Sequence, residues 1–246
     1  MQINGFEIKP GARLSGANLS NEDFRGEDLT GADLSGANLC NANLTGVNLT
    51  GATLRGANLQ NATLFGTRLA GAKLNDANLQ GAVMPSAQLP EADLSNSHLN
   101  AAQLNATNLR HAVLKNANLS NASLENSELD FTDCTQANFT SCLISGSFAD
   151  ANLSNANFSN ADLTYVDFSR SILYRAVFHN ACLVATRFIE TNLIGANLRG
   201  ANVNATNFYK SDLTGADLEF VNTLQAFFTE TRMPDGSYLS RTAKLD

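Results

Sequence analysis

With 246 residues, of which 16% are charged, and a formal net charge of −7 at pH 7, the chain is long enough for one large domain or two smaller ones. The acidic balance argues against a general binder of nucleic acid or of anionic membranes. Because no run of 18 apolar residues occurs, a transmembrane helix is not expected either.

Residues 1–13 precede the regular part of the chain. Phe6 and Ile8 alternate with polar neighbours, which is typical of a short strand, and Pro10-Gly11 predicts a turn. The segment lacks the basic and then apolar organisation of a secretory signal, so we expect a cytoplasmic protein. We predict that residues 1–13 cap the repeated structure that begins at Leu14, because such a structure leaves its terminal core and strand edges open.

From Leu14 to Phe139 an apolar residue recurs at every fifth position. We call this central residue i; it is leucine in 22 of 26 units, and residue i−2 is alanine in 18 of the 26. A period of five matches neither a helix nor the continuous alternation of a strand. It is typical of a short strand, in which i−2 and i point to the same side, followed by a turn at i+1 and i+2. Repetition at a short fixed period predicts a solenoid with a continuous core.

The turn positions carry a signal of their own. Between residues 16 and 81 the i+2 position is Gly ten times, Asn three times and Asp once. These residues tolerate the positive φ that the second central residue of a type II turn requires. Beyond residue 85 the i+2 position also holds residues such as Glu91, His111 and Phe131, so we expect other turn types there.

The repeated unit reads Ala-(Asp/Asn)-Leu-x-x, as in Ala-Asp-Leu-Ser-Gly at 32–36 and Ala-Asn-Leu-Thr-Gly at 42–46. It resembles the unit of the pentapeptide-repeat family, over about residues 12–233. The resemblance implies an all-β fold, a right-handed quadrilateral β-helix (a β-solenoid) with four pentapeptide units per coil. The 45 units in this chain then predict about 11 coils.

The residues give a separate indication of twenty residues per coil. A ten-residue period from Phe148 would require phenylalanine at 198 and 218, where leucine stands, and a fifteen-residue period fails at Leu163. A twenty-residue period fits a column of central phenylalanines at Phe148, Phe168, Phe188, Phe208 and Phe228. It also fits an outward column at i−1 that only His98 interrupts, made of Asn18, Asn38, Asn58, Asn78, Asn118 and Asn138.

One phase slip interrupts the repeat near 141–148. Phe139 keeps the first register, whereas Phe148 and every later centre come one residue early. Leu143 and Ile144 could each point inward, so the pattern leaves open which side of Ile144 is shortened. Neither flank has a linker composition, and we predict a single domain over 1–246, with an N-terminal cap at 1–13, a repeat body at 14–233 and a C-terminal tail or cap at 234–246.

No chemistry-bearing motif stands out from the repeat. Cys142 and Cys182 are predicted to share a column two coils apart, roughly 10 Å at ~4.8 Å per strand, which is too far for a disulfide. The three histidines have no Cys or His neighbour at metal spacing, and no Ser-His-Asp cluster or phosphate-binding glycine loop occurs. We therefore expect no enzyme, no catalytic residues, no metal site and no cofactor.

Large outward apolar residues gather late in the chain. Tyr174 and Ile194 are i+1 residues one coil apart, with Ile172 beside them, and Ile189 and Tyr209 form a second outward stack. Such residues side by side disfavour solubility unless a partner covers them. We predict that this surface makes a protein contact; the alternative is end-to-end stacking of the open C-terminal coil through Leu224 and Phe227. The candidate contact residues are Ile172, Tyr174, Ile189, Ile194 and Tyr209.

These features predict a non-enzymatic protein-binding scaffold or regulator. The partner is either another protein or a second copy of this chain in a homodimer, with no direct contact to nucleic acid or membrane. The family resemblance places such a protein in the bacterial, and especially the cyanobacterial, cytoplasm.

The alternative function is an acidic DNA mimic that binds DNA gyrase or a related type II topoisomerase, as the resemblance implies for some family members. Carboxylates gather in two groups, Glu22, Asp23, Glu27, Asp28 and Asp33, and then Glu125, Glu128, Asp130 and Asp133. The column that contains Asp28 continues, however, as Asn48, Arg68, Gln88 and Asn108. The pattern therefore predicts no unbroken acidic stripe.

Overall fold

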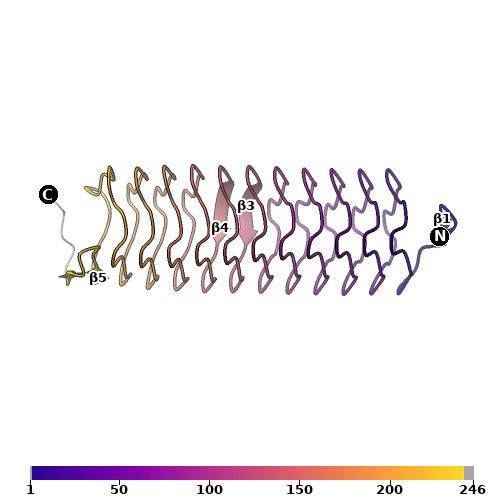
Figure 1. Ribbon diagram of the computed structural model, residues 1–246, viewed down its shortest axis with the longest axis horizontal. Helices are drawn as coiled ribbons and strands as arrows, with labels where there is room; N and C mark the ends of the chain where they lie inside the picture. The colour runs from indigo at the N-terminus through magenta and orange to yellow at the C-terminus, as the bar shows by residue number, and fades with distance from the viewer. Residues whose placement is uncertain (1, 241–246) are drawn as a thin grey trace.

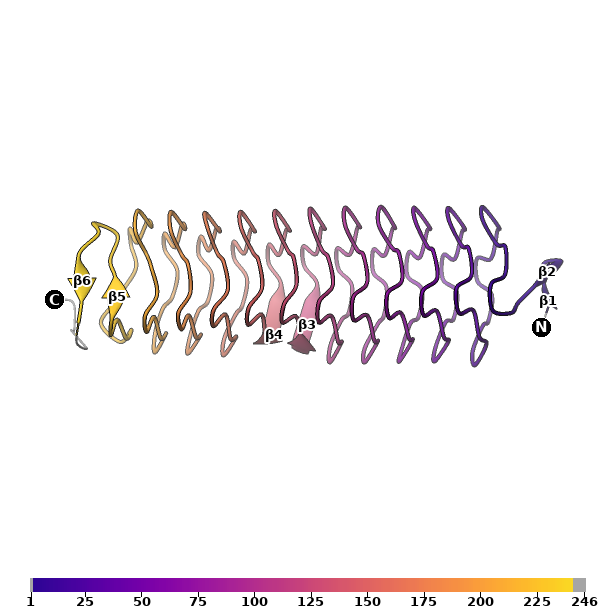
Figure 2. The ribbon, with the colours of Figure 1, turned by 90° about the horizontal axis from the view of Figure 1, so that it is seen from below.

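The computed structural model describes residues 2–240, which form a straight rod of stacked coils with strands β1 (Gln2–Ile3) and β5 (Thr231–Arg232) near its opposite ends (Figure 1). The view from below has the same elongated outline (Figure 2). Parallel β-bridges join residues twenty positions apart along the rod, for example Asn18 with Asn38 and Asn38 with Asn58. This arrangement is a β-solenoid, and it confirms the fold class that the five-residue repeat predicts.

Backbone hydrogen bonds join each unit to both neighbouring coils. The N–H of the central Leu59 donates to Asn78 O at 2.7 Å, and the N–H of Asn78 donates back to Ala57 O at 2.9 Å. At the turn, the N–H of Asn61 donates to Gln80 O at 2.9 Å. The repeated bonds satisfy most buried backbone groups, as a stable core requires.

The asparagine or aspartate at i−1 supplies the bond that the backbone lacks. Asn58 Oδ1 accepts the N–H of Gln60, the i+1 residue, at 3.2 Å. Its amide Nδ2 also donates to Asn38 Oδ1, one coil away, at 3.2 Å. The first bond shapes the turn and the second links the coils. The first bond, which Asp33 Oδ1 also accepts from the N–H of Ser35, explains why both Asn and Asp recur at i−1, whereas the second bond requires the amide of Asn.

The core contains the central residues and the small residues at i−2. Leu59 and Ala57 are both fully buried. Where threonine or serine replaces alanine, its hydroxyl donates to a backbone carbonyl, as Thr186 does to Leu163 O at 2.9 Å. Among residues 2–240, no buried side-chain nitrogen or oxygen is without a partner. Burial of polar side chains therefore carries no unpaired cost in this part of the chain.

Phenylalanines form two stacked columns in the C-terminal half of the core. Phe168 lies 5.2 Å from both Phe148 and Phe188, centroid to centroid, in nearly parallel stacks. It also meets Phe158 and Phe178, which belong to the second column, edge to face at 5.6 and 6.1 Å. All five rings are fully buried, so the columns are packing and not an open channel.

The prediction of other turn types beyond residue 85 is wrong. Glu91, His111 and Phe131 have φ values of 60°, 60° and 59°, close to the 62° of Gly36. The hydrogen-bond ladder is the reason, because the N–H of His111 still donates to Asp130 O at 3.1 Å. Each non-glycine residue in this conformation costs ~1–2 kcal/mol, and the continuous ladder and core offset that cost.

The phase slip lies between strands β3 (Ser123–Glu128) and β4 (Leu143–Ser147), which are parallel neighbours in mid-rod (Figures 1 and 2). Leu124 pairs with Ile144, twenty residues on, but Ser127 pairs with Gly146, only nineteen residues on. The shortened unit therefore follows Ile144, which is 2% exposed, whereas Leu143 points outward.

Cys142 and Cys182 do not share a column, so that prediction is wrong. The bridges run from Leu143 through Asp162 to Cys182. Because Ile144 takes the central position, Cys142 becomes an inward i−2 residue, and its thiol donates to Leu119 O at 2.9 Å. All four cysteines are free.

Thiol accessibility is testable. Burial raises the pKa of the Cys134 and Cys142 thiols to about 12, so neither forms the reactive thiolate at neutral pH. We expect the native protein to expose only Cys40 and Cys182, both half-buried, to a thiol reagent. In denaturant without reductant, all four should react. A count below four in denaturant, or four in the native state, would contradict the assignment.

Short antiparallel strand pairs flank the rod. Strands β1 (Gln2–Ile3) and β2 (Phe6–Glu7) pair at its N-terminal end. Strands β5 (Thr231–Arg232) and β6 (Tyr238–Leu239) pair at its C-terminal end (Figure 2). Residues 2–240 include no helix long and apolar enough to cross a membrane.

Candidate protein-contact surface

The residues predicted to form a contact surface lie on the outside of the C-terminal half of the rod. Ile172 is 45% exposed and Tyr174 is 37% exposed. Ile189, Ile194 and Tyr209 are half-buried. We call these five residues the contact surface.

Backbone bonds place the members of the contact surface in two columns. The N–H of Arg175, next to Tyr174, donates to Ile194 O at 3.0 Å, which stacks the units that carry Tyr174 and Ile194. The N–H of Glu190, next to Ile189, likewise donates to Tyr209 O at 2.8 Å. The structure therefore brings each predicted pair together, one coil apart.

Cations lie against both tyrosine rings of the contact surface. The guanidinium carbon of Arg175 is 5.1 Å from the centroid of the Tyr174 ring. Lys210 Nζ is 5.1 Å from the centroid of the Tyr209 ring, and the Tyr209 hydroxyl donates to Glu230 at 3.5 Å. Cation–π contacts at exposed sites contribute about 0.5–1 kcal/mol each, so they orient the rings. The surface combines apolar area with flanking charge.

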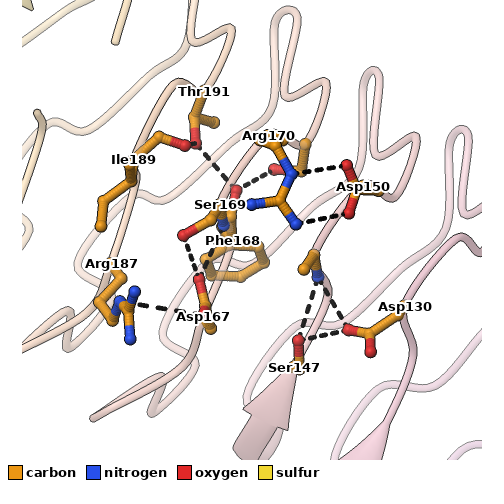
Figure 3. Close-up of polar contacts among 12 residues, drawn as sticks. Asp130, Ser147, Asp150, Asp167, Phe168, Ser169, Arg170, Arg187, Ile189 and Thr191 are labelled. Atoms are coloured by element: carbon orange, nitrogen blue, oxygen red, sulfur yellow. Dashed lines mark hydrogen bonds and ion pairs between the residues drawn. The ribbon is translucent and has the colours of Figure 1, made fainter. Parts of the chain in front are cut away.

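A ladder of alternating charges runs beside the Ile189–Tyr209 column. Arg170 Nη2 is 2.7 Å from Asp150 Oδ2 (Figure 3). Lys210 Nζ is 3.9 Å from a carboxylate oxygen of both Glu190 and Glu230. A hydrogen bond from Arg170 lowers the pKa of the Asp150 carboxyl. Exposed pairs add little stability, but the alternation leaves this edge without a strong field of one sign.

A second polar cluster links the coils on either side of the shortened unit. Asp130 accepts hydrogen bonds from the Ser147 hydroxyl and from the N–H of Ala149, the latter at 3.1 Å (Figure 3). Arg110 donates to the other oxygen of the same carboxylate at 2.6 Å. The Asp130 side chain is 14% exposed, and its contacts join the coils on either side of the slip. We assign this cluster a structural role.

The sequence pattern missed several exposed aromatics because it treated only i−1 and i+1 as outward. Tyr165, Phe220 and Phe131 occupy i+2 and are 73%, 75% and 46% exposed. Their φ values are 65°, 63° and 59°, which is uncommon for bulky residues. An aromatic at the position usually held by Gly or Asn is the signal that could have found them.

The histidines lie apart from any cluster that could hold a metal ion. Within the described part of the chain, no three His, Cys, Asp or Glu residues are grouped as metal ligands. His111 stacks on Phe131 with ring centroids 4.9 Å apart. His179 Nδ1 lies 3.1 Å from Arg199 O in the next coil. Both imidazoles therefore take part in contacts between coils.

A family comparison matches most of the chain. The family model for pentapeptide repeats matches residues 11–46, 32–71, 42–81, 62–100, 107–146, 151–188 and 186–222. The chain belongs to the pentapeptide repeat family. The resemblance drawn from the five-residue unit is thereby confirmed. No curated protein matches the sequence of this pentapeptide repeat protein.

Solved structures of pentapeptide repeat proteins are also similar to this chain. HetL, involved in heterocyst differentiation regulation in the cyanobacterium Nostoc sp. strain PCC 7120, is 29% identical with a TM-score of 0.40, over 92% of this chain and 91% of HetL. Rfr23 from the cyanobacterium Cyanothece 51142 is 29% identical with a TM-score of 0.32, over 42% of this chain and 61% of its own. QnrB1, a plasmid-mediated fluoroquinolone resistance protein, is 19% identical with a TM-score of 0.38, over 70% of this chain and 91% of its own.

Proposed function

We propose that this pentapeptide repeat protein is a non-enzymatic scaffold or regulator that binds a protein partner through the contact surface. The observation that carries the proposal is the pairing of Tyr174 with Ile194 and of Ile189 with Tyr209 in two outward columns beside the exposed Ile172. Apolar and aromatic residues clustered on a surface favour protein contacts. The partner is another protein or a second copy of this chain.

The proposal includes a specific geometry for the rod. Bridges twenty residues apart correspond to four five-residue units per coil, which supports a quadrilateral β-helix of about 11 coils. Its right-handedness is what the resemblance to the family implies. We propose that residues 1–246 form one cytoplasmic domain, with a cap at 1–13, a body at 14–233 and a tail or cap at 234–246. A repetitive rod holds its outward columns in a constant register, which suits a scaffold.

The test is a double substitution within one column, Tyr174→Glu with Ile194→Glu. Both side chains lie outside the core, so the variant should fold with an unfolding midpoint close to that of the parent. Two desolvated carboxylates should weaken association by at least about a hundredfold. Light scattering measures self-association, and a pull-down from the native cell extract measures binding to another protein.

The same column supplies a matched control, Ser154→Glu with Thr214→Glu. Both are i+1 residues one coil before Tyr174 and one coil after Ile194, and the charge change is the same. The control should associate like the parent. If the Tyr174 and Ile194 variant also associates like the parent, the contact surface is ordinary surface, and the C-terminal end around Leu224 and Phe227 becomes the better candidate.

The DNA-mimic alternative has weaker support. Hydrogen bonds from Thr30 and Ser35 lower the pKa of the Asp28 and Asp33 carboxyls, so both stay ionised near the N-terminal end. Carboxylates further along the rod are paired with cations, as Asp133 is with Lys115 at 3.1 Å. A supercoiling assay with DNA gyrase decides the matter, since no effect at stoichiometric excess removes this alternative.

A further inference from the structure

One β-bridge of the regular ladder is missing near the C-terminal end. On the preceding coil, the bridge between Cys182 and Asn202 consists of two bonds. The N–H of Asn202 donates to Ala181 O at 2.9 Å, and Asn202 O accepts the N–H of Leu183 at 2.8 Å. Each residue in the ladder thus satisfies a carbonyl and an N–H on its neighbour, as in any parallel pair.

The equivalent groups one coil further on are Ala201 C=O and Val203 N–H. Asn222 would pair with both, but neither group has a hydrogen-bond partner among the described residues. Ala201 and Val203 are 3% and 1% exposed. Buried backbone groups without partners are rare, so this short edge is an unfilled binding position of the ladder.

Thr223 explains why the last coil leaves this position open. It occupies the central position that Leu183 and Val203 hold on earlier coils, and it is only half-buried. A threonine gains less from burial than leucine does, so the segment around it is displaced. The N–H of Ala205 accordingly donates to Gln225 O at 3.1 Å, twenty residues on, whereas the N–H of Ala185 donates to Asn204 O, nineteen residues on.

A surface pocket of about 210 Å³ lies beside this edge, and its lining includes Asn202 and Asn222, the two residues whose bridge is missing. Its lining is uncharged and consists mostly of side-chain amides, which both donate and accept hydrogen bonds. Leu224, at 57% exposed, adds an apolar wall. The lining residues are Asn202, Asn204, Asn222, Leu224 and Gln225.

We propose that the open ladder position next to Ala201 C=O and Val203 N–H, which we call the slot, binds one residue of an extended polypeptide segment from a protein partner. The N–H of that residue would donate to Ala201 O, and its C=O would accept the N–H of Val203, as Asn202 does for the preceding coil. One donor and one acceptor on the same strand edge match the backbone of a single extended residue. The uncharged lining offers no cation for a phosphate or a carboxylate. This site lies outside the contact surface and goes beyond the proposed function.

The chain has eight valines, so selective ¹⁵N-valine labelling of the full-length protein gives a simple amide spectrum. The Val203→Ile variant, which loses one signal, assigns Val203. The probe is an acetylated and amidated decapeptide that copies residues 42–51, Ala-Asn-Leu-Thr-Gly-Val-Asn-Leu-Thr-Gly. At millimolar peptide, hydrogen exchange of the Val203 amide should slow by at least about tenfold. The internal control is Val177, whose N–H already donates to Ala156 O at 2.9 Å, and its exchange should not change.

A Thr223→Leu variant tests the mechanism without removing any group that the peptide would contact. Leucine at the central position should draw the 221–225 segment into register and close the slot. The Val203 amide should then be protected without peptide, and the peptide should have no further effect. The matched control is Thr214→Leu, at an outward i+1 position, which should keep the response of the parent.

Three results would overturn the proposal. The Val203 amide of the parent could already exchange as slowly as that of Val177, which would mean that Asn222 fills the slot. The peptide at millimolar concentration could leave Val203 unaffected. The peptide response could survive in Thr223→Leu. None of these readouts involves Tyr174 or Ile194, so failure here is distinguishable from failure of the contact surface.

Discussion

Replacement of Gly146 by alanine should destabilise the protein by about 3 kcal/mol or more. Gly146 has a φ of 124°, in a region that L-residues rarely adopt. A Cβ atom there would lie 2.1 Å from Ser127 O, which is backbone and cannot rotate away. The shortened unit brings the backbones of β3 and β4 together at this point. The clash between the added Cβ and Ser127 O can therefore be removed only if the two coils separate. Chemical denaturation, followed by circular dichroism, measures the loss of unfolding free energy.

Gly215→Ala is the matched control for this prediction. Gly215 has a φ of 68°, and an added Cβ would meet no atom within 4 Å. Alanine already occupies the same left-handed turn position at Ala205, where φ is 56°. The control should therefore lose only about 1–2 kcal/mol. Equal losses in the two variants would mean that the close approach of Gly146 to Ser127 does not exist.

The Phe168→Ala variant should lose about 3–5 kcal/mol of unfolding free energy. The ring is fully buried and contacts four other phenylalanine rings, two in its own column and two in the other. Removing it takes away a large apolar surface and leaves a cavity that regular coils cannot collapse to fill. Denaturant titration of the parent and of Phe168→Ala measures this loss of unfolding free energy.

Phe168→Leu is the informative comparison, because leucine is the central residue of this column before the slip, at Leu109 and Leu129. Phe168→Leu should lose clearly less unfolding free energy than Phe168→Ala, because leucine keeps much of the volume of the side chain. If Phe168→Ala loses less than about 1 kcal/mol, the two phenylalanine columns are not the packed core of the C-terminal half.

The five-residue pattern alone predicts the solenoid, the twenty-residue spacing and the inward residues. The unit Ala57–Asn61 shows why. Ala57 and Leu59 are a small and a large apolar residue two positions apart, which suits the core, and the amide of Asn58 between them suits the turn. Asn61 is a turn residue that tolerates positive φ. Because every contact repeats along the chain, one unit predicts the surroundings of the next. The local pattern and the global fold agree, so the pattern is sufficient to predict these features.

Features that depend on a neighbouring coil could not be predicted from the repeat and follow from the folded rod. Whether Leu143 or Ile144 points inward follows from the pairing of Gly146 with Ser127, because glycine alone permits that backbone approach. The left-handed turns at Glu91 and Phe131 follow from the ladder, which outweighs local preference. The open edge at Val203 follows from the displacement of Thr223 one coil later. In each case the deciding partner lies about twenty residues away, beyond the reach of a five-residue pattern.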